Sequence, residues 1–207
     1  SGYSVSLSSD GSVVAIGARY DNSPFFNYYS NHVRVYEYVN NGWSQKGSDI
    51  DGEAGGDQSG YSVSLSSDGS VVAIGTILND GNGSDSGHVR VYEWNKYGNS
   101  EWSQRGPDLD GEAAYDNSGH SVSLSSDGSV VAIGAIKNDG NGSNSGNVRV
   151  YEWDGSAWSQ KGLDIDGEAA DDRSGWSVSL SSDGSVVAIG ATNNDGNGSD
   201  SGHVRVY

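Results

Sequence analysis

A glycine-rich loop with carboxylate, amide and hydroxyl side chains at alternating positions occurs three times in this sequence. It reads NDGNGSDSG at 79–87, NDGNGSNSG at 138–146 and NDGNGSDSG at 194–202. Such side chains supply the oxygen ligands that calcium prefers, and glycines allow the sharp turns that a calcium loop needs. The candidate calcium ligands are Asp80, Asn82, Ser84, Asp85, Asp139, Asn141, Ser143, Asp195, Asn197, Ser199 and Asp200.

Two other interpretations of these glycine-rich loops stay open. Each loop contains Asn-Gly-Ser, which is an acceptor for an N-linked glycan in a protein that passes through a glycosylating pathway. Each loop also lacks a closing bidentate glutamate, and Asn144 stands where the preceding copy has Asp85. A plain connection whose side chains satisfy its own backbone is therefore the third interpretation. The candidate glycosylation sites are Asn82, Asn141 and Asn197.

Catalytic chemistry finds little support in the residue pattern. Acidic pairs such as Asp51 with Glu53 could perform acid–base catalysis, but every acidic cluster recurs three times, whereas an active site is usually one unequal constellation. No serine differs from its copies, and the histidines occupy repeat positions that other polar or aromatic residues fill elsewhere. We therefore expect a non-enzymatic protein with no catalytic residues.

Composition narrows the class of partner. The 207 residues carry a formal net charge of −17 and include no cysteine. The acidic balance argues against a nucleic-acid partner, because phosphate binding needs basic patches. The absence of cysteine excludes disulfides and thiolate metal sites, and no apolar run is long enough to span a membrane.

A tandem repeat must position all of these residues. The segment SVSLSSDGSVVAIG occurs four times, starting at Ser4, Ser62, Ser121 and Ser177. The repeat units extend over approximately 1–58, 59–117, 118–173 and 174–207, the last of them incomplete.

Each unit predicts four β-strands, which in the first unit lie at 3–9, 13–18, 32–37 and 43–50. Asp-Gly between the first two strands is a strong hairpin signal, and the second strand, VVAIGA, is apolar on both faces. A four-stranded unit cannot bury both faces alone, but neighbouring units can cover them. The fold class we predict is all-β, a β-propeller of four-stranded antiparallel blades, with a β-solenoid as the alternative.

The polar loops should gather at one end of such blades. Up-and-down topology places the glycine-rich loops beside the segments that lead from one unit to the next. These crossing loops read DIDGEAGGD, DLDGEAAYD and DIDGEAADD at 49–57, 108–116 and 164–172. This end of the molecule should be strongly acidic. Arginines inside the third strands should pair with crossing-loop carboxylates, and they are Arg34, Arg90, Arg149 and Arg205.

The unit resembles the FG-GAP repeat of the integrin α-subunit β-propeller. The matching segments are GEAGGDQSGYSVSLSSDGSVVAIGT at 52–76 and GHVRVYEW at 87–94. The resemblance implies an extracellular or cell-surface module that binds ligands at the crossing-loop end. Ser59-Gly60 replaces the family's Phe-Gly, and the family's calcium loop between the first two strands is reduced to SSDGS with the single carboxylate Asp68. We therefore do not transfer that calcium site.

The first unit differs from the others in one loop. It reads RYDNSPFFNYYSN at 19–31, two residues longer than its counterparts. Exposed aromatic clusters often mark partner or sugar contacts, although the loop could instead cover the central channel or a neighbouring blade. The candidate contact residues are Phe25, Phe26, Tyr28 and Tyr29.

The last unit shows no fourth strand, so HVRVY at 203–207 would leave an open edge, and open edges recruit partners. A segment of a longer array, a four-bladed ring and self-assembly through this strand all fit. The leading function is a non-enzymatic extracellular scaffold or adhesion module that binds a protein or surface ligand through its acidic loop face. The alternatives are a structural subunit of a surface filament or larger repeat assembly, and a lectin-like glycan binder.

Overall fold

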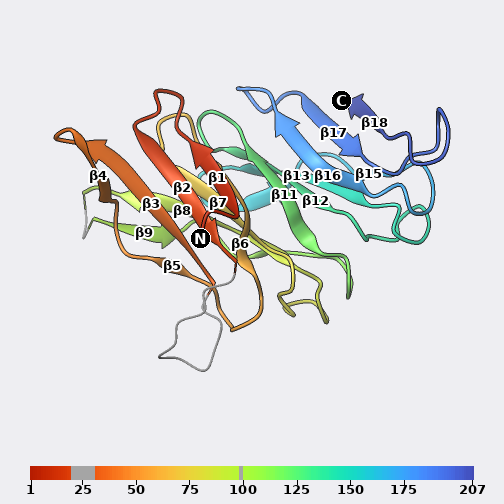
Figure 1. The fold of residues 1–207 in the computed structure, drawn as a ribbon, viewed down its shortest axis with the longest axis horizontal. Coiled ribbons are helices and arrows are strands. Elements are labelled where there is room, and N and C mark those ends of the chain that lie inside the picture. The colour runs from red at the N-terminus through yellow and green to blue at the C-terminus, as the bar shows by residue number, and fades with distance from the viewer. Residues whose placement is uncertain (20–30, 98–99) are drawn as a thin grey trace.

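The computed structural model describes residues 1–19, 31–97 and 100–207, and these contain only β-strands, turns and loops. Four antiparallel sheets follow one another in chain order, with the first and the last at opposite ends of the molecule (Figure 1). The predicted all-β propeller fold is confirmed. We name the sheets blade 1 to blade 4.

The blades are built from 18 strands in the described residues. Blade 1 contains β1 (Ser4–Leu7), β2 (Val13–Ala18), β3 (His32–Val39), β4 (Gly42–Gln45) and β5 (Ile50–Asp51). Blade 2 contains β6 (Ser59–Leu65), β7 (Val71–Thr76), β8 (His88–Asn95), β9 (Glu101–Gln104) and β10 (Leu109–Asp110). Blade 3 contains β11 (Ser118–Leu124), β12 (Val130–Ala135), β13 (Asn147–Trp153), β14 (Trp158–Gln160) and β15 (Ile165–Asp166). Blade 4 contains β16 (Ser174–Leu180), β17 (Val187–Ala191) and β18 (His203–Val206).

The prediction of one continuous fourth strand per blade was wrong. In blade 1 both β4 and β5 pair with β3, and the chain leaves the ladder between them. Gly47 lies in this gap with a positive φ of 79°, and a Cβ there would come within about 3 Å of the rings of Trp94 and Trp102 in blade 2. The interruption recurs in blades 2 and 3 at Gly106 and Gly162, which also have positive φ, and at Gly162 no neighbouring atom lies within 4 Å of the Cβ position, so the local backbone and not the next blade is common to all three.

The hydrophobic core lies between blades and not inside any one of them. Between blades 1 and 2, Val13 and Val33 pack on one side of the interface and Val72 and Ile74 on the other. Val71, next to Val72, points the opposite way and packs against blade 3. This explains why the second strand of each unit is apolar at every position, as the sequence predicted.

The first strands of neighbouring blades approach each other closely. Ser62 Oγ donates to the carbonyl of Gly119 in the next blade at 2.7 Å, and a Cβ on Gly75 would lie 2.1 Å from that same carbonyl oxygen. A side chain at position 75 has no room, so this glycine is required by packing. The same arrangement joins Gly17 to Gly60 and Gly134 to Gly175.

The Asp-Gly hairpins are held by one carboxylate each. Asp68 Oδ1 accepts hydrogen bonds from Ser66 Oγ, from Ser70 Oγ and from the Ser70 amide. Burial alone would raise the pKa of Asp68, but these hydrogen bonds outweigh it and lower the pKa. The equivalent bonds, led by the Ser12 amide in blade 1 and by Ser181 Oγ in blade 4, lower the pKa of Asp10 and of Asp183 to about 2.

These lowered pKa values predict a specific acid sensitivity. An aspartate whose pKa is lower in the folded than in the unfolded state stabilises the fold above the unfolded value of about 3.9. That contribution is lost as the pH falls from about 4 towards 2. The double variant Asp10→Asn with Asp183→Asn should show a flatter decline of unfolding free energy over this range in urea titrations. Asp85→Asn is the control, and equal slopes for all three proteins would contradict the prediction.

The close approach of the blades predicts a steric penalty. Gly75→Ala places a methyl group against the Gly119 carbonyl, and overpacking of this kind should lower the unfolding free energy by about 1–3 kcal/mol. Gly42→Ala is the matched control, because a Cβ at Gly42 meets nothing within 4 Å. Urea unfolding that finds the two variants equally stable would show that the blades are not held at this spacing.

Candidate functional site: the acidic loop face

The glycine-rich loops and the crossing loops meet at one end of the blades, as the sequence predicted. Asn79, which begins the loop of blade 2, is buried and donates from Nδ2 to Glu53 Oε2 at 3.2 Å and to Asp57 Oδ2 at 3.0 Å. Both acceptors belong to the crossing loop that precedes the blade. Asn138 and Asn194 make the same pair of bonds in blades 3 and 4.

In blades 2 and 3 the glycine-rich loop also holds the crossing loop that follows it. Asn82 Nδ2 donates to the carbonyls of Gly111 and Glu112, both at 2.9 Å. Asn141 makes the equivalent two bonds to Gly167 and Glu168. The candidate calcium ligand Asn82 therefore turns its amide nitrogen towards the neighbouring loop.

The other candidate calcium ligands are partly engaged within their own loop. Asp80 Oδ1 accepts from the Asp85 amide at 2.8 Å, and Asp139 and Asp195 accept from the equivalent amides of Asn144 and Asp200. Asn144 also donates to Asp171 of the crossing loop at 3.2 Å. Direct hydrogen bonds thus join the glycine-rich loop to the crossing loop. Calcium binding to the oxygen atoms that remain stays a prediction.

The three candidate glycosylation sites differ in their surroundings. A glycan attached to Asn82 or Asn141 would replace one of the two amide hydrogens that hold the crossing loop. The side-chain amide of Asn197 is exposed and makes no hydrogen bond among the described residues. Glycosylation stays a prediction, and Asn197 is the copy at which it would disturb the structure least.

The strand arginines all contact the crossing loops, and Arg34, Arg90 and Arg205 pair with carboxylates there as expected, whereas Arg149 is shown bonded to a backbone carbonyl. Arg34 forms a two-point contact with Asp49 of its own blade. Arg90 lies 3.8 Å from Glu53 of the preceding crossing loop and donates to the Asp51 carbonyl. Arg149 and Arg205 donate to the equivalent carbonyls of Asp110 and Asp166.

One group of three side chains in the described residues could hold a metal ion. Glu53, His88 and Asp108 place one ligand atom each within 4.8 Å of the others. Burial lowers the pKa of His88, against the opposing effect of Asp108, so its imidazole is neutral and able to act as a ligand. Arg90 already balances Glu53, and in blade 3 Asn147 takes the place of His88 and donates to Glu112. The group is thus one variant of a repeated polar contact.

A row of rings lines the start of the first strands. Tyr3, Tyr61, His120 and Trp176 follow one another from blade to blade, with centroid separations of 5.1, 5.1 and 4.8 Å. The Arg19 guanidinium lies 3.8 Å from the centre of the Tyr3 ring. From the sequence, this repeat position only accepts different polar or aromatic residues. The sequence did not show that the rings at this position in successive blades contact each other.

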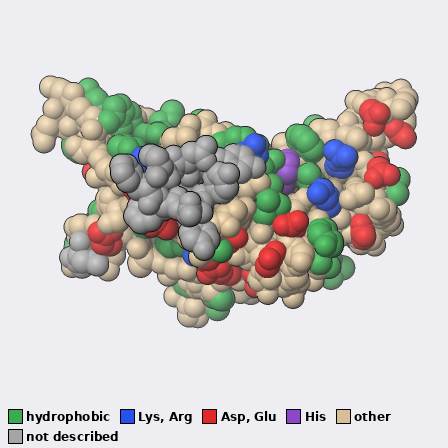
Figure 2. Space-filling view, turned by 60° about the horizontal axis from the view of Figure 1, so that its bottom comes forward, with side chains coloured by type: hydrophobic (Ala, Val, Ile, Leu, Met, Phe, Trp, Pro, Cys, Tyr) green, Lys and Arg blue, Asp and Glu red, His purple; other side chains and the backbone are tan. Residues whose placement is uncertain are grey.

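Exposed carboxylates remain on this face after these contacts are made. Figure 2 is turned towards this end of the blades and shows Asp and Glu side chains in separate groups along it. Burial raises the pKa of Asp110 and of Asp166, and in Asp166 repulsion from Asp164 adds to the effect. The predicted aromatic contact residues Phe25, Phe26, Tyr28 and Tyr29 lie outside the described residues.

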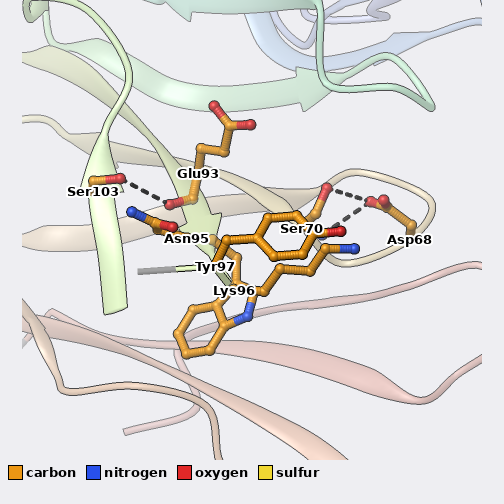
Figure 3. Close-up of a pocket in the computed structure, with 8 residues that line it drawn as sticks. Asp68, Ser70, Glu93, Asn95, Lys96, Tyr97 and Ser103 are labelled. Atoms are coloured by element: carbon orange, nitrogen blue, oxygen red, sulfur yellow. Dashed lines mark hydrogen bonds between the residues drawn. The ribbon is translucent and has the colours of Figure 1, made fainter. Parts of the chain in front are cut away.

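A hollow of about 430 Å³ lies away from this face, beside the hairpin turn of blade 2. Figure 3 shows Lys96, Tyr97 and Glu93 around it, with Ser70 hydrogen-bonded to Asp68. The Ser–Asp pair recurs in the equivalent turns of the other blades. It is therefore a turn contact and gives no sign of a nucleophile.

Comparison with known families agrees with this architecture. Residues 109–151 and 160–207 match the model of the FG-GAP repeat. The chain carries FG-GAP repeats. The first matched segment runs from β10 into β13, and the second runs from the last residue of β14 to one residue past β18, so each contains nearly all of a crossing loop and the first three strands of the next blade. No curated protein matches the chain, and no helix in its described part is long and apolar enough to cross a membrane.

Solved structures show the same fold at low identity. A protein provisionally named a 6-phosphogluconolactonase from Bacteroides uniformis has a TM-score of 0.60 at 12% identity, covering 94% of this chain and 51% of its own. Sqt1 from Saccharomyces cerevisiae has a TM-score of 0.56 at 13% identity, covering 94% and 43%. The β-propeller domain of the Trilobed protease from Pyrococcus furiosus has a TM-score of 0.53 at 11% identity, covering 99% and 52%. The chain spans about half the length of these structures.

The calcium prediction has a direct measurement. Millimolar calcium that binds the glycine-rich loops should raise the melting temperature, because ligand at about 100 times its dissociation constant stabilises the native state by ~2.7 kcal/mol. Asp80→Asn combined with Asp139→Asn and Asp195→Asn should abolish the shift, and magnesium is the control for ionic strength. An unchanged melting temperature in calcium would remove the metal from these loops.

Proposed function

We propose that the chain is a non-enzymatic binding module of an extracellular or cell-surface protein, and that its acidic loop face contacts a protein ligand with basic side chains. The repeated exposed carboxylates of this face are the observation that supports the proposal. Asp80, Asp139 and Asp195 occupy one position in three blades, and all three are exposed. Glu53, Glu112 and Glu168 form a second exposed set.

The balance of charge on this face favours a cationic partner. One strand arginine per blade turns towards the crossing loops, and it is shared between a carboxylate and a backbone carbonyl in blades 2 and 4. The formal charge of the whole chain is −17, so most carboxylates have no cation to balance them. Opposite charge on a partner would speed association and fix its orientation, with a strong dependence on salt.

The FG-GAP repeat supports the extracellular setting, because such repeats are typical of extracellular proteins and their propellers are usually binding modules. The described residues also offer no unequal catalytic constellation. Their acidic clusters, serine turns and strand arginines recur from blade to blade, which suits a surface that makes the same contact several times.

Binding to a polylysine peptide tests the role of the loop face. The triple variant Asp80→Asn, Asp139→Asn and Asp195→Asn keeps the acceptor oxygen for the loop amide and removes three charges. Exposed pairs contribute about 0.2–1 kcal/mol each, so the affinity measured by calorimetry should fall about tenfold. Raising the salt concentration should reduce the difference between wild type and variant.

The control removes the same charge from the opposite end of the blades. Glu37, Glu93 and Glu152 occupy one position of the third strands, paired with the start of the second strands near the serine turns. The triple change of these residues to glutamine should leave peptide affinity nearly unchanged. An equal loss in both triple variants would show a response to net charge alone and would contradict a loop-face ligand site.

A further inference from the structure

The group of Glu53, His88 and Asp108 lies where the crossing loops before and after blade 2 approach the start of β8. Glu53 belongs to the first of these loops, His88 is the first residue of β8, and Asp108 begins the second loop. One ligand atom of each residue lies within 4.8 Å of the other two. All three residues belong to the middle of the array, between blade 1 and blade 3.

His88 is a buried polar side chain whose hydrogen-bonding capacity is unused. It is 1% exposed, and neither of its ring nitrogens makes a hydrogen bond among the described residues. Nδ1 faces Asp108 Oδ2 at 3.6 Å, which is too far for a hydrogen bond. A buried polar group without a partner is costly and calls for an explanation, such as an ion that bridges it to its neighbours.

The separation of 3.6 Å between Nδ1 of His88 and Oδ2 of Asp108 suits two ligands of one zinc ion. Zinc binds nitrogen and oxygen at about 2.0–2.2 Å in tetrahedral geometry, which places neighbouring ligand atoms about 3.4 Å apart. The Glu53 side chain is 49% exposed, so its rotation can bring a carboxylate oxygen to the same ion. Burial lowers the pKa of His88 and keeps the imidazole neutral, and the neutral form is the one that binds a metal.

Neighbouring amides orient both carboxylates of the group. Gln104 Nε2 donates to Asp108 Oδ1 at 2.6 Å, so Oδ2 is the oxygen that remains to face His88. Asn79 Nδ2 donates to Glu53 Oε2 at 3.2 Å. Hydrogen bonds of this kind hold the ligands of a metal site in place and raise its affinity.

Arginine holds the equivalent aspartate in blade 1 but not in blade 2. Arg34 makes a two-point contact with Asp49, which is the counterpart of Asp108. Arg90 instead donates to a backbone carbonyl of the preceding crossing loop and lies 3.8 Å from Glu53. One guanidinium group is thus set against two carboxylates, and the excess negative charge favours a divalent cation.

Blade 3 shows how the same contact is made when the histidine is replaced. Asn147 stands at the position of His88 and donates to Glu112 Oε2 at 3.1 Å. Gln160 orients Asp164 there by a hydrogen bond of 2.6 Å. A direct amide bond therefore joins the crossing loop to the third strand in blade 3, whereas blade 2 has a histidine that no hydrogen bond holds.

We propose that Glu53, His88 and Asp108 bind one zinc ion, through Nδ1 of the histidine and one oxygen of each carboxylate. The ion joins the crossing loops on either side of blade 2 to the start of β8. Three protein ligands leave the fourth tetrahedral position to water, as in zinc sites that stay open to solvent. The ion enters from the side of the exposed Glu53 side chain.

Calorimetric titration of the metal-free chain with zinc tests the site. At about 0.15 M salt, which screens exposed charges, the wild type should show one tight site per chain. His88→Asn introduces the residue found in blade 3 and should lower the zinc affinity by more than about 100-fold, because even residues behind the ligands contribute about 10–100-fold. The triple change of Glu37, Glu93 and Glu152 to glutamine is the control for net charge and should leave the site intact.

The reverse exchange in blade 3 tests the geometry. Asn147→His should create a second site with Glu112 and Asp164, and the stoichiometry should rise from one zinc ion to two. Circular dichroism should show that the variants fold, and if His88→Asn does not, Asp108→Asn replaces it. A wild type that binds no zinc, an unchanged affinity in His88→Asn, or a stoichiometry that stays at one in Asn147→His would each overturn the assignment.

Discussion

Close contact between the first two strands of one blade and the first strand of the next is the constraint on which the rest of the structure depends. Gly75 and Gly119 lie so near each other that no side chain fits, and Ser62 bridges the same point. At this spacing the valines of adjacent second strands interlock, and both faces of the sheets in blades 2 and 3 become interior. A blade alone would expose two apolar faces, so stability comes from the array, as in other repeat proteins.

The same spacing decides what the loops can do. Because blades lie side by side, the glycine-rich loops of blades 2 and 3 each fall between two crossing loops and bind both. Asn79 satisfies Glu53 and Asp57 on one side, while Asn82 holds the following crossing loop on the other. The buried side chains of these loops therefore have a structural role, and the exposed side chains can contact solvent or a ligand.

Much of the blade structure could be predicted from the sequence, because a pattern that recurs in every repeat shows which local features the fold requires. Asp-Gly marked the hairpins, the doubly apolar second strand indicated stacked blades, and Arg90 among acidic loops pointed to its partners. The interruption at Gly47 was not predicted, because it rests on a left-handed backbone conformation at one glycine among many in the sequence. The Glu53, His88 and Asp108 group was missed because its members come from two blades and from separate segments of the sequence.

Repetition also separates the roles of the acidic residues. Asp57, Asp116 and Asp172 are buried and accept an amide in every copy, so packing is a sufficient explanation for their identity. Glu53, Glu112 and Glu168 accept from the same asparagines, but they remain exposed and keep their charge at the surface. Their like charges at one end oppose folding through mutual repulsion, and the apolar burial between blades offsets that cost. An array that keeps such a charge pattern at one end alone is suited to recognition at that end, with its stability supplied by the interfaces between the blades.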